Sequence, residues 1–350
     1  EDPRDAAKDG RTLVKRGLTR LITPGTLLDE ETLQPGEANR LVAVTGLVPD
    51  HAAVGIAALD VSTGRFTVEE ATTAAQLAVA LARLAPAEVV VPEDLRHQAA
   101  EVLRGLCAPV ALPPISCLPA FAWKAADARR WLAGRLRVGS LDGFDLGLGC
   151  DHLVAAAAAA LRYAEGAVRI AEESAALAAD SARGLGHIRS VTRLRAGSGL
   201  VLDATCRRNL DLLRNSRDGA RAGSLLAAVD RTRTAPGARL LAEWLARPLA
   251  EVTAIAARHD AVGCLVDDDQ LRADARDALA RIYDLERLVA RIATGRAHAR
   301  DLVQLAQSLS AAADVGAACS GHKLPHLLAT AATGLDPAPE LIAMITRTLV

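Results

Sequence analysis

Four aspartates in the first half of the sequence are of the residue type that metal-dependent phosphoryl chemistry needs. Asp60 ends the apolar run AVGIAALD and is expected on a strand, whereas Asp94, Asp142 and Asp145 are expected in loops. If several of these carboxylates converged, they could hold two divalent metals and support nuclease chemistry. Isolated carboxylates more often cap helices, fix turns or face solvent. We favour these structural roles and predict no catalytic residue and no metal site.

Arginines gather in a second stretch, between residues 207 and 239. A face of guanidinium groups could contact DNA phosphates, and Arg207, Arg208 and Arg214 are the candidates for weak DNA contacts. The stretch contains no aromatic residue that would stack on single-stranded bases. We favour the alternative, in which these side chains cover helix surfaces and pair with nearby aspartates. The set is Arg207, Arg208, Arg214, Arg217, Arg221, Arg231, Arg233 and Arg239.

Other functional motifs are missing from the sequence. The six cysteines include no CxxC pair, which favours a reducing, cytoplasmic setting over a zinc site or a disulfide framework. No HExxH motif is present, and His187 and His259 are expected to form hydrogen bonds rather than bind a metal. No Gly-Lys pair exists, so the phosphate-binding loop GxxxxGK[ST] is absent and no cofactor site is predicted in this chain.

The overall composition indicates a chain of more than one domain with a sizeable core. It has 350 residues, which suggests two or three domains of about 150 residues each. Lysine and arginine number 41 against 42 aspartate and glutamate, so charge alone does not indicate a nucleic-acid partner. Hydrophobic residues make up 51% and aromatic residues 2%, so aliphatic side chains must fill the core. No apolar run reaches the roughly 18 residues of a membrane helix.

The first half of the chain, which contains the four aspartates, is predicted to form strands and helices. TPGT, at 23–26, predicts a turn, and residues 41–68 are extended with a hairpin at Ser62, Thr63 and Gly64. Residues 73–85 predict a helix that ends at Pro86, and EVVVP, at 88–92, predicts a buried strand. Strands that alternate with helices favour an α/β layer domain.

The rest of the chain is predicted to be helical. An amphipathic helix at 126–138 places Trp131, Leu132 and Leu136 on one side, and a glycine-rich loop follows at 140–149. Residues 150–179 predict one or two alanine-rich helices, and an extended linker follows at 184–200. The remaining helices are expected at 204–216, 224–230, 236–246, 251–266, 271–294, 299–312 and 338–349.

The stretch RTRTAPGARLLAEWLARPL, at 231–249, predicts one short helix with clear limits. Thr234 is a good N-cap, Pro236 suits the first turn, and Arg247-Pro248 ends the helix. Its apolar face is expected to pack into the core and comprises Leu240, Leu241, Trp244 and Leu245. None of these residues supplies a nucleophile, a base or a metal ligand, so the stretch is architectural.

Several motifs resemble, in order, the MutS family of mismatch-repair proteins. VKRGLTRLITPGTLLDE, at 14–30, is similar to the end of the family's mismatch-recognition domain. LDVSTGRF, LAPAEVVVPED and VGSLDGF, at 59–66, 84–94 and 138–144, resemble its connector domain. Four further stretches are similar to the family's core domain. They are VLDATCRRNLDLL (201–213), SLLAAVDRTRTAPGARLLAEWLARPL (224–249), RHDAVGCL (258–265) and IYDLERLVARIATGRAHARDL (282–302).

The resemblance implies a multidomain chain, α/β followed by all-α. Residues 1–40 would be the remnant of the mismatch-recognition domain. Residues 41–186 would be a ribonuclease-H-like connector with a helical insertion near 164–186, and residues 187–350 a partial helical core and lever domain. The residues implied to be structural signatures are Thr234, Gly237, Arg239, Leu241, Trp244, Pro248, Leu249, Asp284, Leu285, Glu286, Arg287, Arg300, Asp301 and Leu302.

The resemblance also implies a function and partners. The parent protein would be a homodimer that binds mismatched double-stranded DNA, hydrolyses ATP with magnesium and recruits MutL. This segment would couple DNA recognition to the ATPase and dock MutL. The family's Phe-x-Glu mismatch-reading motif is absent, because none of Phe66, Phe121 and Phe144 is followed by Glu at that spacing. We therefore expect an interior fragment without ATPase activity of its own.

Local departures from the family pattern give further expectations. Pro236 is displaced by one position, so the helix start there is where we expect the structure to differ first. Ala299 replaces a proline, so the helices on either side are expected to fuse. Two alternatives to the mismatch-repair interpretation stay open. One is a stand-alone ribonuclease-H-like nuclease, and the other is a non-catalytic scaffold paralogue.

Overall fold

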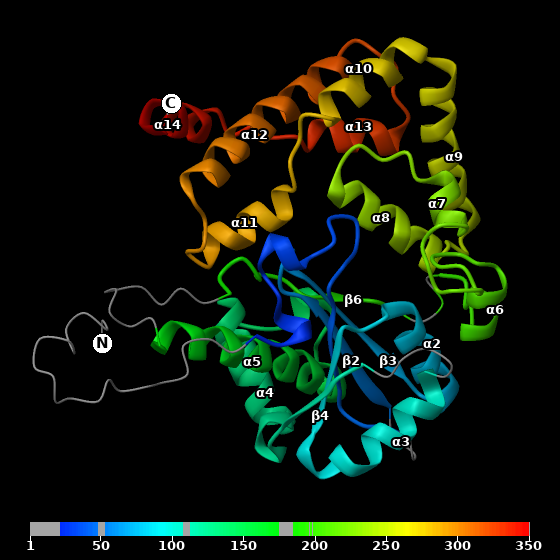
Figure 1. Cartoon of the computed structure of the whole chain (residues 1–350), viewed down its shortest axis with the longest axis vertical. Coiled ribbons are helices and arrows are strands. Elements are labelled where there is room, and N and C mark those ends of the chain that lie inside the picture. Colours follow the sequence, from blue (N-terminus) through cyan, green and yellow to red (C-terminus); the bar gives the residue numbers. More distant parts are fainter. Residues whose placement is uncertain are drawn as a thin grey trace, which may run out of the picture.

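The computed structural model describes residues 22–47, 53–107, 113–174, 185–195, 197 and 199–349. They form a lower α/β unit and an upper helical unit, with residues 22–40 running between the two (Figure 1). We call residues 22–40 the strap. The part of the mismatch-domain resemblance at 14–21 lies outside the described residues. No helix within the described ranges is long and apolar enough to cross a membrane.

The α/β unit is built on one mixed sheet, whose order is β5-β4-β1-β2-β3-β6. Its strands are β1 (Leu41–Val44), β2 (Val54–Asp60), β3 (Arg65–Ala71), β4 (Glu88–Pro92), β5 (Ile115–Leu118) and β6 (Thr192–Arg193). The β1–β2 and β2–β3 pairs are antiparallel, and the other pairs are parallel. The predicted hairpin is confirmed: Gly64 has φ of 75° and donates its N–H to the Asp60 carbonyl at 2.8 Å.

Helices cover both faces of this sheet. On one face lie α4 (Ala125–Leu136) and α5 (Asp151–Ser174), and on the other lie α2 (Ala74–Leu84) and α3 (Arg96–Cys107). Alanines 155–160 of α5 are buried, and the backbone of α5 comes so close to β2 that a Cβ on Gly55 would lie 2.1 Å from the His152 carbonyl oxygen. Small residues therefore let the helix lie directly on the strands.

The predicted elements of this unit largely agree with the structure. The alanine-rich segment forms one helix as far as Ser174, and residues 175–184 of the expected insertion lie outside the described residues. Leu132 and Leu136 of α4 are buried in the same cluster against which Trp131 packs. The TPGT turn is confirmed as the 3-10 helix Pro24–Thr26, and a second such turn follows at Glu30–Thr32.

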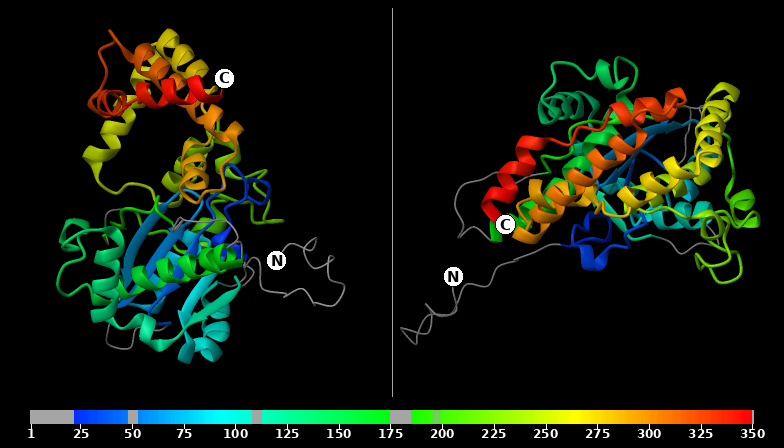
Figure 2. Two further views of the ribbon diagram at one scale, coloured as in Figure 1. Left: turned by 90° about the vertical axis from the view of Figure 1, so that its left-hand side faces the viewer. Right: turned by 90° about the horizontal axis from the view of Figure 1, so that it is seen from above.

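The helical unit extends away from the sheet. It contains α6 (Ala204–Asn209), α7 (Leu225–Val229), α8 (Ala235–Ala246), α9 (Val252–Asp267), α10 (Asp269–Leu279), α11 (Leu285–Ala293), α12 (Ala299–Cys319), α13 (His326–Thr333) and α14 (Pro339–Leu349). Helices α8 and α11 face the sheet, α12 leads away from the end of α11, and α10 and α13 lie at the far end of the unit (Figures 1 and 2). Leu305, Ala306 and Ile345 are the buried centre of a small core between α12 and α14.

Three helix predictions in this unit are wrong. The helix expected at 204–216 ends at Asn209, because Asp211 has φ of 45° and the Asn215 side chain accepts two backbone N–H groups of a turn. The helix expected at 271–294 is two helices, α10 and α11. Between them the Tyr283 N–H is held by the Ser308 hydroxyl at 3.0 Å, and Asp284 caps the start of α11.

The expected fusion of helices around Ala299 is the third error. Helix α11 ends at Ala293, and Gly295 has φ of 66°, which a continuing helix cannot accommodate. Helix α12 then starts with its own cap, in which the Asp301 side chain accepts the His298 N–H at 2.8 Å. A glycine and a cap therefore separate the two helices without the proline. Helix α12 also continues beyond residue 312, to Cys319, and α13 was not predicted.

Candidate functional site

A buried arginine joins the strap to two helices of the helical unit. Arg239 of α8 is 8% exposed and donates two hydrogen bonds to the Asp284 carboxylate, at 2.7 and 2.8 Å. It donates a third to Glu286 Oε2 at 2.6 Å. It also donates to the Pro35 carbonyl oxygen in the strap at 2.7 Å. One planar guanidinium thus fixes α8, the start of α11 and the strap.

A second buried arginine completes this arrangement. Arg287 of α11 donates to the Glu37 carbonyl oxygen of the strap at 2.8 Å, and its Nε lies 3.7 Å from Asp284 Oδ2. We call Arg239, Asp284, Glu286 and Arg287 the clasp. The expectation that these arginines cover helix surfaces is wrong for Arg239, because the carboxylates at the start of α11 neutralise it in the interior. The clasp is a buried polar connection between the strap and the helical unit.

The charges of the clasp depend on one another. Burial alone would lower the pKa of Arg239, but the hydrogen bonds and charges of Asp284 and Glu286 outweigh burial and raise it. Burial and the neighbouring Arg239 charge lower the pKa of Arg287. Asp284 therefore serves two cations and also caps α11, where it accepts the Arg287 N–H at 3.3 Å. Removing Arg239 would leave this carboxylate largely buried beside a single arginine.

A second ion-pair group lies on the same side of the helical unit. Arg291 donates to Asp301 Oδ1 at 2.7 Å and lies 3.2 Å from Glu30 of the strap. Burial raises the pKa of Asp301, but the His298 N–H and the Arg291 charge outweigh it and lower the pKa. The strap is thus held to α11 at two places, through Arg287 and through Arg291.

The strap is also anchored to the sheet through a buried carboxylate that the sequence did not single out. Glu88, which is 1% exposed, accepts the Gly25 N–H at 2.9 Å and the hydroxyls of Ser116 and Tyr163, each at 2.6 Å. Burial, with the Glu88 hydrogen bond, raises the pKa of Tyr163 to about 12. A Cβ on Gly25 would lie 2.7 Å from the Leu41 side chain, so glycine is required for this approach.

The candidate metal-binding aspartates do not form a metal site. Asp60 is on β2 as predicted and is buried, and its carboxylate accepts from the Asn39 N–H and the Ser62 hydroxyl. Asp94 is exposed in a 3-10 turn. Among the residues that the structure describes, no group of three His, Cys, Asp or Glu side chains could hold a metal ion. The geometry therefore lends no support to the nuclease alternative.

The other two candidate carboxylates have local structural partners. Asp142 accepts from the Ser140 hydroxyl at 2.5 Å. Asp145 forms a two-point ion pair with Arg195 at 2.8 and 2.9 Å. The hydrogen bond from Arg195 lowers the pKa of Asp145. Both aspartates therefore fix the loop between α4 and α5.

The predicted histidine roles differ between the two residues. The His187 Nε2 lies 2.8 Å from the Val61 carbonyl oxygen, so the predicted hydrogen-bonding role is confirmed. His259 is exposed on α9. Two further histidines, His322 and His326, stand four residues apart, but His326 starts α13 and His322 precedes it. His322 instead pairs with Asp268 at 2.9 Å.

The three arginines named as candidate DNA contacts have different surroundings. Arg207 is half-buried and donates to the Leu202 carbonyl oxygen at 3.0 Å and to that of Ala246. Arg214 is exposed and pairs with Glu37 of the strap at 3.1 Å. Arg208 is exposed on α6. Of the rest, Arg221 pairs with Asp230, while Arg217, Arg231 and Arg233 are exposed.

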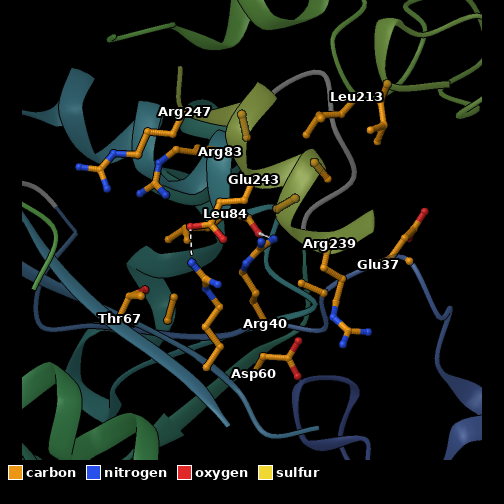
Figure 3. A pocket seen from close by; sticks show the side chains of 18 of the residues that line it. Glu37, Arg40, Asp60, Thr67, Arg83, Leu84, Leu213, Arg239, Glu243 and Arg247 are labelled. Atoms are coloured by element: carbon orange, nitrogen blue, oxygen red, sulfur yellow. Dashed lines mark hydrogen bonds and ion pairs between the residues drawn. The ribbon is translucent and has the colours of Figure 1, made fainter. Parts of the chain in front are cut away.

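A pocket of about 180 Å³ lies where α8 approaches the sheet. Arg40, Arg83, Arg247 and Glu243 gather around it (Figure 3). Arg65 pairs there with Glu243 at 2.5 Å and so connects β3 to α8. Sequence reasoning missed these residues, because they come from four separate segments and have no common motif.

Comparison with known families agrees with the order of elements in the chain. The family model of MutS domain II matches residues 39–168, and that of MutS domain III matches residues 205–350. This chain belongs to the MutS family. The domain II match lies in the α/β unit, and the domain III match covers the helical unit from residue 205 onward.

Individual MutS relatives match across nearly the whole chain. The DNA mismatch repair protein MutS of Thermosynechococcus vestitus is 38% identical over 98% of this chain. The proteins of the same name from Symbiobacterium thermophilum and Myxococcus xanthus are 39% and 38% identical, over 94% and 97% of this chain. The matches cover 37%, 35% and 36% of those proteins, so the chain spans little more than a third of their length.

The MutS signature residues are mainly structural in this fold. The Thr234 hydroxyl accepts the Gly237 N–H at 3.1 Å and caps α8, whose first residue is Ala235. Pro236 is in the first turn, as predicted, so its displacement leaves the start of the helix intact. Leu285 and Leu302 pack on the small core of the helical unit, and Arg300 is exposed. Leu241, Pro248 and Leu249 are half-buried.

The predicted apolar face of α8 is wrong. Leu240 is 40% exposed and Trp244 is 38% exposed, and the buried residues of the helix are Ala238, Arg239 and Ala246. The helix is rotated so that its arginine enters the clasp, while Trp244 lies on the outside with Arg258 stacked 3.6 Å from its ring centre. Three satisfied hydrogen bonds to carboxylates hold the polar face inward in place of the apolar one.

Proposed function

We propose that this chain is the segment of a MutS mismatch-repair protein that couples DNA recognition to ATP hydrolysis. The relatives that share nearly all of it are named DNA mismatch repair protein MutS. The observation that carries the proposal is the clasp. Its two arginines hold the strap against α8 and α11 through the carbonyl oxygens of Pro35 and Glu37. A displacement of the strap would therefore move the helical unit.

Each part of the chain would then have its own role in the parent protein. Residues 1–40 would end a mismatch-recognition domain, residues 41–186 would be the connector, and residues 187–350 would begin the core and lever domain. A ribonuclease-H-like connector is supported by the strand order, with a β1–β2–β3 antiparallel meander continued by the parallel strands β4 and β5. The strap would carry a change in the DNA-reading end to both later domains.

The partners belong to the whole protein. We propose that the parent is a homodimer that binds mismatched double-stranded DNA, uses ATP with magnesium, and docks MutL on the α/β unit. Arg208, exposed on α6, is the candidate DNA contact whose side chain is best placed to reach a phosphate. Cys117, Cys150, Cys206, Cys264 and Cys319 are free thiols, which suits a cytoplasmic protein.

The coupling can be tested in the full-length parent protein with Arg239→Met. The control is Arg130→Met, at a side chain that is 80% exposed on α4. We expect Arg239→Met to retain mismatched-duplex binding and to lose most of the stimulation of ATP hydrolysis by that duplex. The control should retain both. Stimulation that is unchanged in Arg239→Met would contradict the coupling role.

A further inference from the structure

Two free cysteines lie at the far end of the helical unit. Cys264 is near the end of α9, and Cys319 is the last residue of α12. Both thiols are half-buried, and neither is in a disulfide. Helix α10, which follows α9, packs along α12, and α13, which follows α12, packs on α9. The two helix ends that carry the cysteines therefore come from separate segments but meet at the same end of the unit (Figures 1 and 2).

An ion pair fixes the chain just after each cysteine. Asp268 stands four residues after Cys264 and caps α10, where it accepts the Leu271 N–H at 2.9 Å. His322 stands three residues after Cys319, and its Nδ1 lies 2.9 Å from Asp268 Oδ2. This contact, so near both cysteines in the sequence, holds the end of α12 beside the end of α9.

An open groove of about 640 Å³ gives solvent access to the same place. Cys264 lines it, together with residues 267–269 and with residues 323–325, which connect α12 to α13. Its volume is many times the roughly 30 Å³ share of one water molecule, so a small oxidant has room to reach the Cys264 thiol. Access for an oxidant is one condition for forming a disulfide, and a neighbouring second thiol is the other.

The two thiols are close enough to affect each other's ionisation. Burial raises the pKa of the Cys319 thiol, and the charge of Cys264 raises it further. A like charge shifts a pKa in this way only at short range, because solvent and salt screen more distant charges. Among the residues that the structure describes, no group of three His, Cys, Asp or Glu side chains could hold a metal ion. The two cysteines are therefore neighbouring thiols and not part of a described metal site.

We propose that Cys264 and Cys319 form a reversible disulfide when the chain meets a peroxide. The Cys264 thiolate, on the groove, attacks one oxygen of hydrogen peroxide, becomes a sulfenic acid and releases hydroxide. The Cys319 thiolate then attacks that sulfur, the S–S bond forms, and the sulfenic oxygen leaves as a second hydroxide. The two protons from the thiols convert both hydroxides to water. One disulfide is thus formed as one peroxide is reduced to two waters.

The disulfide closes the helical unit at the end opposite the clasp. The clasp joins α8 to the start of α11, α9 follows α8, and α12 follows α11. In the reduced chain, the far ends of these two arms are joined by the exchangeable pair of His322 and Asp268. In the oxidised chain a covalent bond joins them. This modification site does not depend on the proposed coupling through the clasp.

Peroxide treatment of the 350-residue chain tests the proposal without any substitution. Free thiols are blocked afterwards, and the digest is analysed by mass spectrometry without reductant. We expect the peptides of Cys264 and Cys319 to be joined with the loss of two hydrogens, and dithiothreitol to separate them. Folding keeps the two thiols together, so this link should form about tenfold faster than any other cysteine pair, and about tenfold faster than in urea. No such link, or other pairs that form equally fast, would overturn the proposal.

Three serine variants show which thiol reacts first. Cys319→Ser should leave Cys264 as a sulfenic acid, which dimedone traps at one per chain. Cys264→Ser should abolish the link, whereas Cys206→Ser, at an exposed cysteine of α6, should leave its rate unchanged. The oxidised chain should also unfold at a higher temperature than the reduced chain, because the disulfide closes a long loop. A link found only between two copies of the chain would contradict the proposal.

Discussion

The sheet interior and the junction between the two units are held together in opposite ways. In the sheet interior, α5 buries alanines 155–160 and packs on the strands, and Gly55 lets the backbones of α5 and β2 lie close together. At the junction, Arg239 and Arg287 are buried instead, and their terminal nitrogens donate hydrogen bonds to carboxylate or carbonyl oxygens, whereas the Nε of each has no hydrogen-bond partner among the described residues. The first region is fixed by shape and the second by directional hydrogen bonds.

The two kinds of contact should respond differently to force. A close-packed apolar interface has no alternative arrangement of similar energy, so it acts as a rigid body. A buried ion pair contributes little net stability relative to apolar packing, but it specifies one geometry and is costly to leave half-made. We therefore expect the arrangement of the two units to depend on single side chains at the junction more than in the sheet interior.

The largest effect is expected from filling the gap between β2 and α5. Gly55→Ala places a Cβ about 2.1 Å from the His152 carbonyl oxygen, so α5 must move off the sheet. The free energy of unfolding should fall by about 3 kcal/mol in a urea titration. Gly166→Ala, in the same helix with open space around it, should not destabilise the chain. Equal effects of the two variants would show that the contact is unimportant.

A smaller effect is expected at the junction. Arg239→Met leaves Asp284 and Glu286 without their shared cation, and the free energy of unfolding should fall by about 2 kcal/mol. Arg239→Lys keeps the charge but loses the fork, so it should recover only part of this loss. A urea titration of both variants, followed by circular dichroism, gives the comparison. Full recovery by lysine would mean that charge alone, and not geometry, holds the clasp.

A still smaller effect is expected on the outer face of α8. Trp244 is 38% exposed and contacts Arg258, so Trp244→Ala should cost less than about 1 kcal/mol in thermal unfolding. A buried tryptophan would cost about 3–5 kcal/mol. A loss in that higher range would show that the apolar face of α8, and not its arginine, is the inner one.

The smallest effect is the pH dependence of stability that comes from His187, whose ring contacts Val61 in the turn between β2 and β3. Burial lowers the pKa of His187 below its ordinary value of 6.5, and its Nδ1 is buried without a partner among the described residues. The unfolded chain then binds the proton more readily, so stability is present above about pH 6.5 and is lost as pH falls below it. Unfolding measured from pH 7.5 to 5.5 should show this loss, and His187→Gln should reduce it. An equally steep loss in His187→Gln would assign it to other groups.

The sequence predicted those elements that depend on residues close together in the chain. The β2–β3 hairpin, the cap at Thr234 and the alanine-rich helix all depend on residues a few positions apart, and all three were predicted. The packing of α8 depends on Asp284 and Glu286, which are 45 and 47 residues from Arg239. Local amphipathicity therefore predicted the wrong inner face. The split of the expected 271–294 helix likewise depends on Ser308, which binds the Tyr283 N–H from α12.

The candidate sites show the same limit. Asp284, Glu286 and Arg287 were expected only as structural signatures, and their partner in α8, Arg239, was expected on a helix surface. The arginine pocket was missed because Arg40, Arg65 and Arg83 come from the strap, β3 and α2, and Arg247 comes from the residue after α8. Only the folded chain brings these side chains together, and no spacing in the sequence records it.

Hydrogen exchange on the Arg239→Met chain tests most directly whether a separate polar junction holds the two units together. We expect faster exchange in the described strap, α8 and α11, because these are the segments that the clasp joins. Exchange in β2 and α5 should be unchanged, since the sheet interior is held independently. Unchanged exchange in the strap, or an equal increase in both regions, would contradict a separate polar junction between the two units.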